Sequence, residues 1–333
     1  MGGVCAKAAS GAFARKEDRG KNVPKRFDAV GIGYTALDYL GIVPHLPVEN
    51  SKLEVRDFKI QGGGPTATAM VTVRRLGLGA AYVGKVGDDA FGTRMLEELR
   101  REDVDVSSVV IEPGATSQYA FIMVDARTAA RTILWTRGSV SSLKAREVDL
   151  DLVRSARGLF IDDLEPEAAL VAAKAARKAK IPVLIDAGSL REGVRELLPL
   201  CDYIIASELF AEQISGGKKL HEALETMSAF GPKAAVVTLG EKGCAFLSGR
   251  DLVDVPGFPV KAVDTTGAGD VFHGAYLFAV LEGLDTMRAC TFANAVAALK
   301  CRRLGGRAGI PTLSGALAFL ARERPGLDLP LKS

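Results

Sequence analysis

The residues that best define a chemistry in this chain are 264–270, which read Asp-Thr-Thr-Gly-Ala-Gly-Asp and directly precede an apolar, helix-like segment. Small residues let a backbone approach a ligand closely, and the first N–H groups of a helix have no partners within the helix. Those groups and the helix dipole favour an anion. The string therefore predicts an anion pocket that would stabilise a phosphoryl group in transfer.

Asp270 closes this string in the first turn of the predicted helix. A carboxylate there can accept a proton from an attacking hydroxyl, which makes Asp270 a candidate general base. First-turn acids also commonly do no more than complement the helix dipole. The complete string, entering an apolar helix after several strand–helix units, favours the catalytic interpretation.

A second glycine run, Gly62-Gly63-Gly64, precedes another helix-like segment and allows close contact with a polyol, although such runs more often mark plain turns. Asp38 follows the first strand-like run and could hold sugar hydroxyls, although capping or loop aspartates are commoner. The chain contains neither GxxxxGK[ST] nor GxGxxG, which excludes the two commonest nucleotide-phosphate cradles.

The elements that must position these residues alternate between short apolar runs and longer helix-like segments. The runs do not alternate in polarity, which is typical of parallel strands covered on both faces. This order predicts an α/β sheet with helices on both faces. The expected strands are 29–33, 81–87, 158–162, 182–186, 202–206 and 234–239, and the expected helices include 66–76, 92–102 and 167–180.

Two stretches interrupt this alternation. Residues 39–60 contain a strand-like run at 53–60, and residues 117–136 contain two such runs joined by a polar turn. We expect antiparallel strands that form a small β-sheet over the main domain. Such insertions account for a chain of 333 residues, which is long for one ordinary domain.

The charge of the chain is mild overall and unevenly placed. The 43 Lys and Arg against 40 Asp and Glu give a net charge of +3, which gives no support to a nucleic-acid partner. Residues 1–26 contain seven basic and two acidic side chains, and we expect them to form a disordered basic tail. No apolar run approaches the roughly 18 residues of a membrane-spanning helix, so we expect no membrane partner.

The five cysteines are isolated and form no CxxC pair, and the three histidines complete no zinc-ligand spacing. An odd number of such cysteines suits a reducing compartment. We therefore expect a cytoplasmic protein.

Residues 62–65, 75–77 and 83–92 resemble the first signature of the ribokinase (PfkB-type) sugar kinases, and residues 264–270 resemble the second. The resemblance covers roughly residues 27–313. It implies a ribokinase-like, Rossmann-type three-layer α/β/α domain at 27–324, with a small β-sheet lid formed by the insertions and a C-terminal tail at 325–333. Within the family, residues 207–208, 263–274, 297–301 and 305–311 are most similar to the sulfofructose kinases.

The resemblance also implies roles for individual residues. Asp270 would be the base, and the backbone of Gly267, Ala268 and Gly269 the anion hole. The implied sugar-site residues are Asp38, Gly63, Gly64, Thr68, Lys52 and Asp162, where Ala67 or Thr68 replaces the usual Asn of the family. The implied ATP-site residues are Thr238, Gly240, Gly243, Asn294 and Ser207. Glu208 and Glu212 are candidates for Mg²⁺ although the usual NxxE motif is absent, and Asp264 would lie near a monovalent-cation site, for instance for K⁺, formed mostly by backbone carbonyls.

These roles predict an ATP-dependent kinase that phosphorylates a hydroxymethyl group of a ketose or related sugar, such as a sulfofructose-, fructose- or ribose-like substrate. A homodimer through the lid is expected. For a sulfonate, Lys52 matches the family residue, and Arg131 or Arg137 would supply a second cation. A nucleoside kinase is the alternative, because Tyr34, Tyr119 and Trp135 could stack a base; the intact 264–270 string argues against a non-catalytic regulator.

Overall fold

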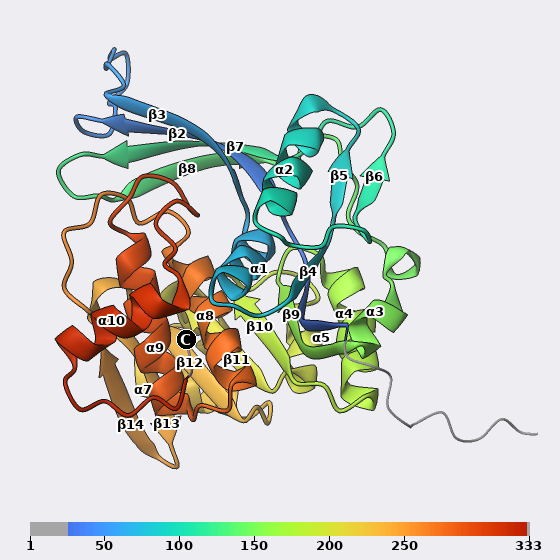
Figure 1. The fold of residues 1–333 in the computed structure, drawn as a ribbon, viewed down its shortest axis with the longest axis vertical. Helices are drawn as coiled ribbons and strands as arrows, with labels where there is room; N and C mark the ends of the chain where they lie inside the picture. The colour runs from blue at the N-terminus through green and yellow to red at the C-terminus, as the bar shows by residue number, and fades with distance from the viewer. Residues whose placement is uncertain (1–25, 332–333) are drawn as a thin grey trace, which may run out of the picture.

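The computed structural model describes residues 26–331. Figure 1 shows a large central sheet packed among helices, with a smaller sheet above it. The strand order of the large sheet is β14-β13-β12-β11-β10-β9-β1-β4. Its parallel strands are β1 (Phe27–Ile32), β4 (Ala80–Val83), β9 (Ala156–Asp162), β10 (Val183–Ala187), β11 (Tyr203–Ser207) and β12 (Ala234–Thr238). The hairpin of β13 (Gly243–Ser248) and β14 (Asp251–Pro256) adds two antiparallel strands at one edge.

Helices cover both faces of this sheet, as predicted, and each face has its own apolar cluster. One face carries α1 (Pro65–Arg75), α2 (Ala90–Arg101), α8 (Ala268–Leu281), α9 (Thr286–Lys300) and α10 (Leu313–Glu323). The other face carries α3 (Leu150–Arg154), α4 (Pro166–Lys178), α5 (Val194–Leu197), α6 (Glu208–Ser215) and α7 (Leu220–Ser228). Three short 3₁₀ turns are η1 (Ala145–Glu147), η2 (Leu198–Leu200) and η3 (Gly240–Lys242).

Helix α8 lies at the centre of its layer, since its side chains from Val271 to Ala279 are all buried. A helix that is apolar on all sides must be covered on all sides. Its contact with α1 depends on Gly274, where a Cβ would meet the Ala69 carbonyl oxygen at 2.5 Å. The core packing thus fixes the position of the helix whose first turn holds Asp270.

The lid is a four-stranded sheet with the order β3-β2-β7-β8. Its strands are β2 (Ala36–Val43), β3 (Asp57–Gly63), β7 (Tyr119–Asp125) and β8 (Arg131–Thr136). β2 pairs with β7 in parallel and the outer pairs are antiparallel, so the expected all-antiparallel sheet is corrected. The lid also begins at Ala36 and ends its first hairpin at Gly63, beyond the expected limits of 39–60.

The expected strand 81–87 is divided in two. Gly84 separates β4 from β5 (Lys85–Gly87), and a Cβ at Gly84 would meet the Tyr82 hydroxyl at 2.0 Å. β5 leaves the large sheet to pair with β6 (Val110–Glu112), which the sequence did not predict. A side chain would therefore not fit at Gly84, the residue between the two strands.

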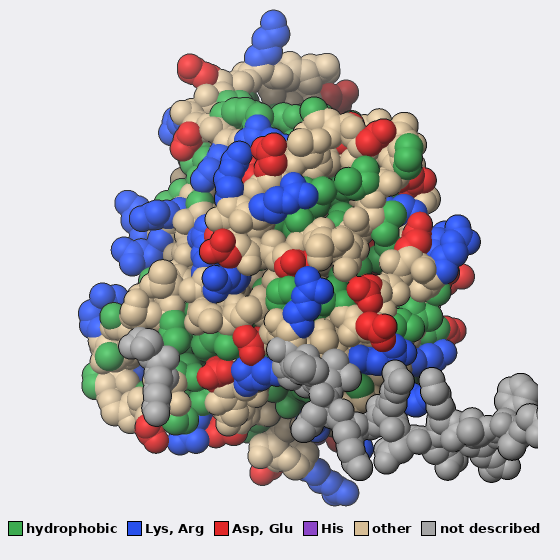
Figure 2. Space-filling view, turned by 45° about the vertical axis from the view of Figure 1, so that its right-hand side comes forward, with side chains coloured by type: hydrophobic (Ala, Val, Ile, Leu, Met, Phe, Trp, Pro, Cys, Tyr) green, Lys and Arg blue, Asp and Glu red, His purple; other side chains and the backbone are tan. Residues whose placement is uncertain are grey.

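The two predicted tails are described to different extents. The predicted basic tail at 1–26 lies outside the described residues, apart from Arg26. In the predicted C-terminal tail, Leu327, Leu329 and Leu331 pack against the core cluster. None of the described helices is long and apolar enough to cross a membrane. On the face drawn in Figure 2, Lys and Arg side chains are interspersed with Asp and Glu.

Candidate active site

The candidate site lies at the carboxyl ends of the parallel strands, where the strand order reverses. β1 lies between β4 and β9, so the chain builds the sheet first to one side of β1 and later to the other. Ligands of open α/β sheets bind at such a switch point. Residues 33–35 join β1 directly to β2, which places the base of the lid at this edge.

The residues of the predicted anion pocket lie at the N-terminus of α8. Gly267 is the N-cap with φ of 72°, a left-handed conformation that glycine adopts easily. A Cβ on Gly269 would meet no atom within 4 Å, so the space beside it is open. The Ala268 N–H already donates to the Thr265 carbonyl at 3.2 Å. The N–H groups of Gly269 and Asp270 have no partner within a helix and can bind an anion without breaking that turn.

Asp270 is half-buried in the first turn of α8. Burial, followed by the charge of Asp186, raises its pKa to about 6. Asp186 Oδ2 also lies 2.7 Å from Nδ1 of His273, whose positive charge opposes the rise in the pKa of Asp270. A base accepts a proton most effectively when its pKa is near the working pH, so this environment suits the predicted role.

Asp38 lies in β2 with 6% of its surface exposed. A Cβ on Gly63 would meet Asp38 Oδ2 at 1.9 Å, so glycine is required where β3 passes this carboxylate. Burial raises the pKa of Asp38 to about 7, with Arg307 opposing the rise and Asp270 adding to it. The two predicted functional carboxylates, one from the lid and one from α8, therefore lie close enough to interact.

Asp162, predicted to contact the sugar, is 1% exposed and makes its hydrogen bonds inside the protein. Its Oδ2 accepts hydrogen bonds from the Tyr34 N–H at 2.7 Å and the Thr66 hydroxyl at 2.6 Å. Its Oδ1 accepts one from the Leu164 N–H at 3.0 Å. This prediction is corrected: Asp162 connects the end of β9 to the start of the lid and to α1.

Thr68 is likewise corrected from a sugar ligand to a supporting residue. It is 1% exposed, and its hydroxyl accepts a hydrogen bond from Arg307 Nε at 3.2 Å. Arg307 Nη2 donates to the Gly63 carbonyl at 2.8 Å. Gly64 has φ of 85°, and a Cβ there would meet Thr35 Cα at 2.5 Å. The backbone of the glycine run thus lies too close to its neighbours to carry side chains. The buried guanidinium of Arg307 stabilises it through the Gly63 carbonyl.

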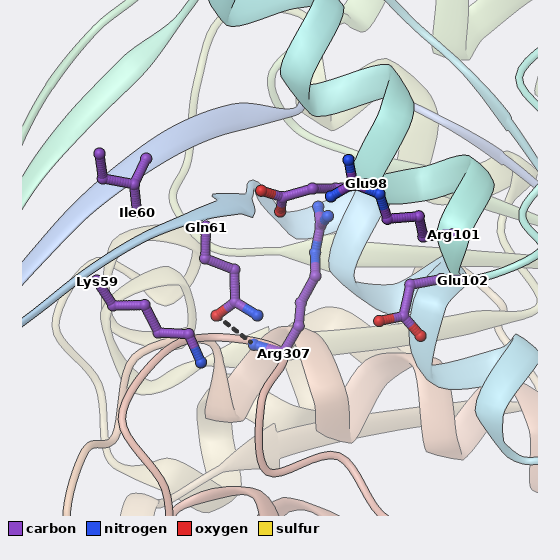
Figure 3. Close-up of a pocket in the computed structure, with 7 residues that line it drawn as sticks. All are labelled: Lys59, Ile60, Gln61, Glu98, Arg101, Glu102 and Arg307. Carbon is purple, nitrogen blue, oxygen red and sulfur yellow. Dashed lines mark hydrogen bonds between the residues drawn. The ribbon is translucent and has the colours of Figure 1, made fainter.

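A cavity of about 230 Å³ lies beside this glycine run (Figure 3). Figure 3 shows Glu98 of α2 and Arg307 pointing toward one another across it. Its lining includes neither Asp38 nor Asp270, so it is a neighbour of the candidate site and not its centre. The lining residues are Lys59, Ile60, Gln61, Glu98, Arg101, Glu102 and Arg307.

Three of the predicted ATP-site residues lie together at the ends of β12 and β13. Thr238 ends β12, Gly240 begins η3 and Gly243 begins β13. Gly243 has φ of 99°, and a Cβ there would meet the Val255 carbonyl oxygen at 2.1 Å. Gly240 has φ of 60°, and a Cβ there would meet nothing. This turn follows β12, which pairs with β11. It therefore lies at the carboxyl ends of the parallel strands, where the candidate site is.

Ser207 and Asn294, both predicted to lie at the ATP site, have hydrogen-bond partners within the protein. The Ser207 hydroxyl caps α6 by accepting a hydrogen bond from the Phe210 N–H at 3.0 Å, and it donates to the Gly188 carbonyl at 2.8 Å. Asn294 is 7% exposed and its Nδ2 donates to the Val255 carbonyl at 3.1 Å. Both side chains therefore hold the walls of the predicted nucleotide site.

Glu208 and Glu212 lie one turn apart at the start of α6, and both are exposed. Mg²⁺ usually keeps several waters and is bound by one or two carboxylates together with substrate phosphates. The pair fits that pattern. No cluster of three or more metal-ligating side chains occurs within residues 26–331.

The backbone carbonyls near Asp264 already bind a positive charge. Asp264 is fully buried, and its carboxylate accepts hydrogen bonds from the N–H groups of Thr266 at 2.7 Å and Gly305 at 2.8 Å. The Lys300 ammonium donates to the Asp264 carbonyl at 3.0 Å and to the Thr266 carbonyl. The Lys300 ammonium therefore lies at the carbonyls beside which the monovalent-cation site, for instance for K⁺, was predicted.

Lid residues divide between its two faces. Asp38, Ala120 and Trp135 are paired in register across β2, β7 and β8, so they share a face. The rings of Trp135 and Tyr34 meet edge to face at 5.9 Å between centroids. Tyr119 follows the opposite alternation and packs on Phe91 and Phe121, so its predicted role in base stacking is corrected. Lys52 is exposed in the loop beyond the far ends of β2 and β3.

The sequence reasoning missed Lys300, Arg307 and the Asp186–His273 pair. Lys300 and Arg307 belong to segments far from their partners in sequence, and a basic residue near a helix end usually only complements the dipole. His273 could have been noticed, since its position three residues after Asp270 puts both on one face of α8.

Comparison with known proteins gives concordant matches. The family model for pfkB family carbohydrate kinases matches residues 27–313. A fructokinase from Solanum tuberosum is 31% identical over 313 residues, covering 87% of this chain and 95% of the relative. A nucleoside kinase from Methanothermobacter thermautotrophicus is 26% identical over 296 residues, covering 87% and 94%. The crystal structure of a ribokinase from Thermotoga maritima aligns with a TM-score of 0.75 at 26% identity, covering 88% of this chain and 98% of that one.

Proposed function

This chain belongs to the pfkB family of carbohydrate kinases, and from that premise we propose that it transfers the γ-phosphate of ATP to a hydroxymethyl group of a ketose or related sugar. The observation that carries the proposal is the meeting of two carboxylates with a helix N-terminus. Asp38 comes from the lid and Asp270 from the first turn of α8, and the charge of Asp270 adds to the rise in the pKa of Asp38. Such a site can hold a polyol on one side and a phosphoryl group on the other.

The proposed reaction is an in-line transfer. The hydroxymethyl oxygen attacks the γ-phosphorus, its bond to phosphorus forms as the bond to ADP breaks, and the hydroxyl proton passes to Asp270. The N–H groups of Gly269 and Asp270 stabilise the charge on the transferring group. Asp38 accepts hydrogen bonds from sugar hydroxyls and orients the acceptor.

The nucleotide is proposed to bind along the ends of β11 and β12. Thr238, Gly240 and Gly243 form the turn that would approach it. Glu208 and Glu212, with the phosphates, would hold Mg²⁺, which neutralises phosphate charge when bound.

The sugar is proposed to be fructose-, ribose- or sulfofructose-like. Arg137 does not favour the sulfonate, because its Nη1 is bound to the buried Glu165 at 2.5 Å. Arg131, at the start of β8, is exposed and its charge acts on Asp270. Arg131 is therefore the cation of this lid best placed for an anionic group on the substrate.

A nucleoside kinase is the second candidate, and the position of Trp135 favours it. Trp135 is 50% exposed and shares the lid face of Asp38. An exposed indole on that face could stack a base while the carboxylate binds ribose hydroxyls.

We also propose a homodimer formed through the lid. Phe58, Phe121 and Leu134 are each more than half exposed, and the strand register puts them on the lid face opposite Asp38. Exposed apolar patches of this kind commonly mark interfaces. A reducing, cytoplasmic location is proposed from the free thiols of Cys201, Cys244, Cys290 and Cys301, all buried.

An ATP-consumption screen tests the function. Ketoses, aldoses, sugar phosphates, sulfofructose and nucleosides are offered separately with Mg²⁺, and phosphorylated product is identified. Asp270→Asn should lower kcat by about 10²- to 10⁴-fold with ATP binding retained, because the base is lost. Turnover of nucleosides alone would support the second candidate, and wild-type turnover in the variant would contradict the role of Asp270.

A further inference from the structure

Lys300 is a completely buried lysine directly beneath the segment that leads into α8. It is the last residue of α9 and has 0% of its surface exposed. Its Nζ donates to the backbone carbonyls of Asp264 and Thr266. Buried ammonium groups are costly unless paired and hydrogen-bonded, so this lysine is held in place by a specific site.

The site has the donor set of a cation-binding site. Backbone carbonyls and a carboxylate are the ligands that hard cations prefer. Asp264 supplies the negative charge, and its electrostatic attraction opposes the effect of burial, which lowers the pKa of Lys300. The carboxylate itself is turned toward the N–H groups of Thr266 and Gly305, so it fixes the loop whose carbonyls face the ammonium.

This cation acts on the anion pocket through a short connection. Thr266 is followed at once by Gly267, the N-cap of α8. The carbonyls that Lys300 holds therefore set the path of the residues whose N–H groups face the pocket. The charge of Lys300 also reaches Asp270, where it favours the ionised carboxylate.

We propose that the Lys300 ammonium replaces a monovalent cation. It holds residues 264–270, the anion loop, in place and makes phosphoryl transfer independent of K⁺. A second cation cannot share these carbonyls, because the ammonium already occupies the centre between them and would repel it. The claim about turnover rests on the proposed kinase function. The claim about the occupied carbonyls does not.

The wild-type enzyme supplies the first test. Its kcat is measured with K⁺, Na⁺ or tetramethylammonium as the sole monovalent cation at constant ionic strength. We expect values within about twofold of one another, since the loop already holds its cation. Activation by K⁺ of about tenfold or more would overturn the proposal.

Lys300→Met supplies the second test, because it keeps the length of the side chain and removes the charge. In tetramethylammonium we expect a lowered Tm and a kcat reduced by about 10²-fold, the scale of losing a transition-state donor. K⁺ or NH₄⁺ should restore a large part of both by occupying the freed carbonyls. Equal Tm and kcat in all three salts would overturn the proposal.

The matched control is Lys85→Met. Lys85 is 6% exposed and is bound to Glu147 at 2.9 Å, so its loss should lower Tm without any recovery specific to K⁺. If the wild type turned over no acceptor, the proposed function would fail, while K⁺-specific recovery of Tm in Lys300→Met would still support the cation site. Should that variant not fold, the salt series on the wild type decides.

Discussion

At the residue scale, the chemistry depends on how the cleft sets the pKa of Asp270. Its pKa of about 6, raised first by burial and then by Asp186, requires the base to be protonated in mild acid. We expect kcat/KM to fall as the pH drops through about 6, whereas an ordinary aspartate would titrate near 4. A pH–rate profile of the wild type measures this limb.

His273 is the group that could be mistaken for Asp270 in that profile. Asp186 raises the pKa of His273, although burial acts the other way. The variant His273→Gln should keep the acidic limb and move it to higher pH, because a positive charge beside Asp270 is lost. Disappearance of the limb in this variant would assign it to the histidine instead.

Asp38 should show opposite effects on stability and activity. Its folded pKa of about 7 exceeds the ordinary value of 3.8, so the native state binds more protons between these values and stability falls as pH rises through that window. Asp38→Asn should therefore raise Tm at pH 8 by about 2 °C or more, with little change at pH 4. The same variant should raise KM for the sugar at least about tenfold, because an ionised acceptor is lost.

The control for Asp38 is Asp57→Asn, which removes an exposed carboxylate from β3 of the same lid. It should change neither Tm at pH 8 nor KM by a measurable amount. A Tm gain at pH 8 equal in both variants would indicate a general charge effect on the lid and contradict the desolvation of Asp38.

At the element scale, a hydrogen bond joins the lid to the anion loop and can act as a latch between them. The Thr265 hydroxyl donates to the Ala129 carbonyl at 3.1 Å, and Ala129 lies in the turn between β7 and β8. Thr265→Val should weaken closure, because it keeps the shape and removes the donor. Since closure excludes water, we expect ADP formed per sugar phosphate to rise above one, together with a several-fold higher KM.

Thr266→Val is the matched control for this latch. The Thr266 hydroxyl is buried and has no hydrogen-bond partner within the described part of the chain, so replacing it should leave the coupling of ATP use to product unchanged. Equal uncoupling in both variants would show that the loop, and not the latch, was disturbed.

The elements themselves show what the sequence could predict. Strands β9 to β12 and helices α1, α2 and α4 begin and end within a few residues of their predicted limits, because buried apolar runs and caps are local patterns. The break lies at Gly84, against the Tyr82 hydroxyl, which donates to the Gly33 carbonyl 49 residues away. The role of Asp162 depends on donors 96 and 128 residues away. Such long-range contacts leave no trace in local spacing.

The site was predictable to the same extent. Asp270 and the glycines belong to one compact sequence motif. Lys300, in contrast, donates to carbonyls that are 34 and 36 residues away in the sequence. The sequence therefore predicted an anion pocket at residues that the structure places at the start of α8. It could not predict the contact of Lys300 with the carbonyls of Asp264 and Thr266, because that contact depends on how α9 packs against this segment.

At the scale of the whole molecule, the outer face of the lid predicts association. Phe121, Phe58 and Leu134 are 51%, 58% and 57% exposed on adjacent strands, and an isologous dimer would cover the same face on both copies. We expect light scattering to give about twice the chain mass of 35.2 kDa for the wild type. Phe121→Glu should give the single-chain mass, since a charge would be buried in the interface.

Leu252→Glu is the control for that substitution, because it adds the same charge at an apolar side chain 39% exposed on β14, in the main sheet. It should leave the dimer intact. A lid dimer would also link association to catalysis, because Asp38 and the Thr265 latch both act through this sheet. Phe121→Glu should therefore raise KM for the sugar as well as halve the mass, and a monomeric variant with unchanged KM would show that the lid closes without its partner.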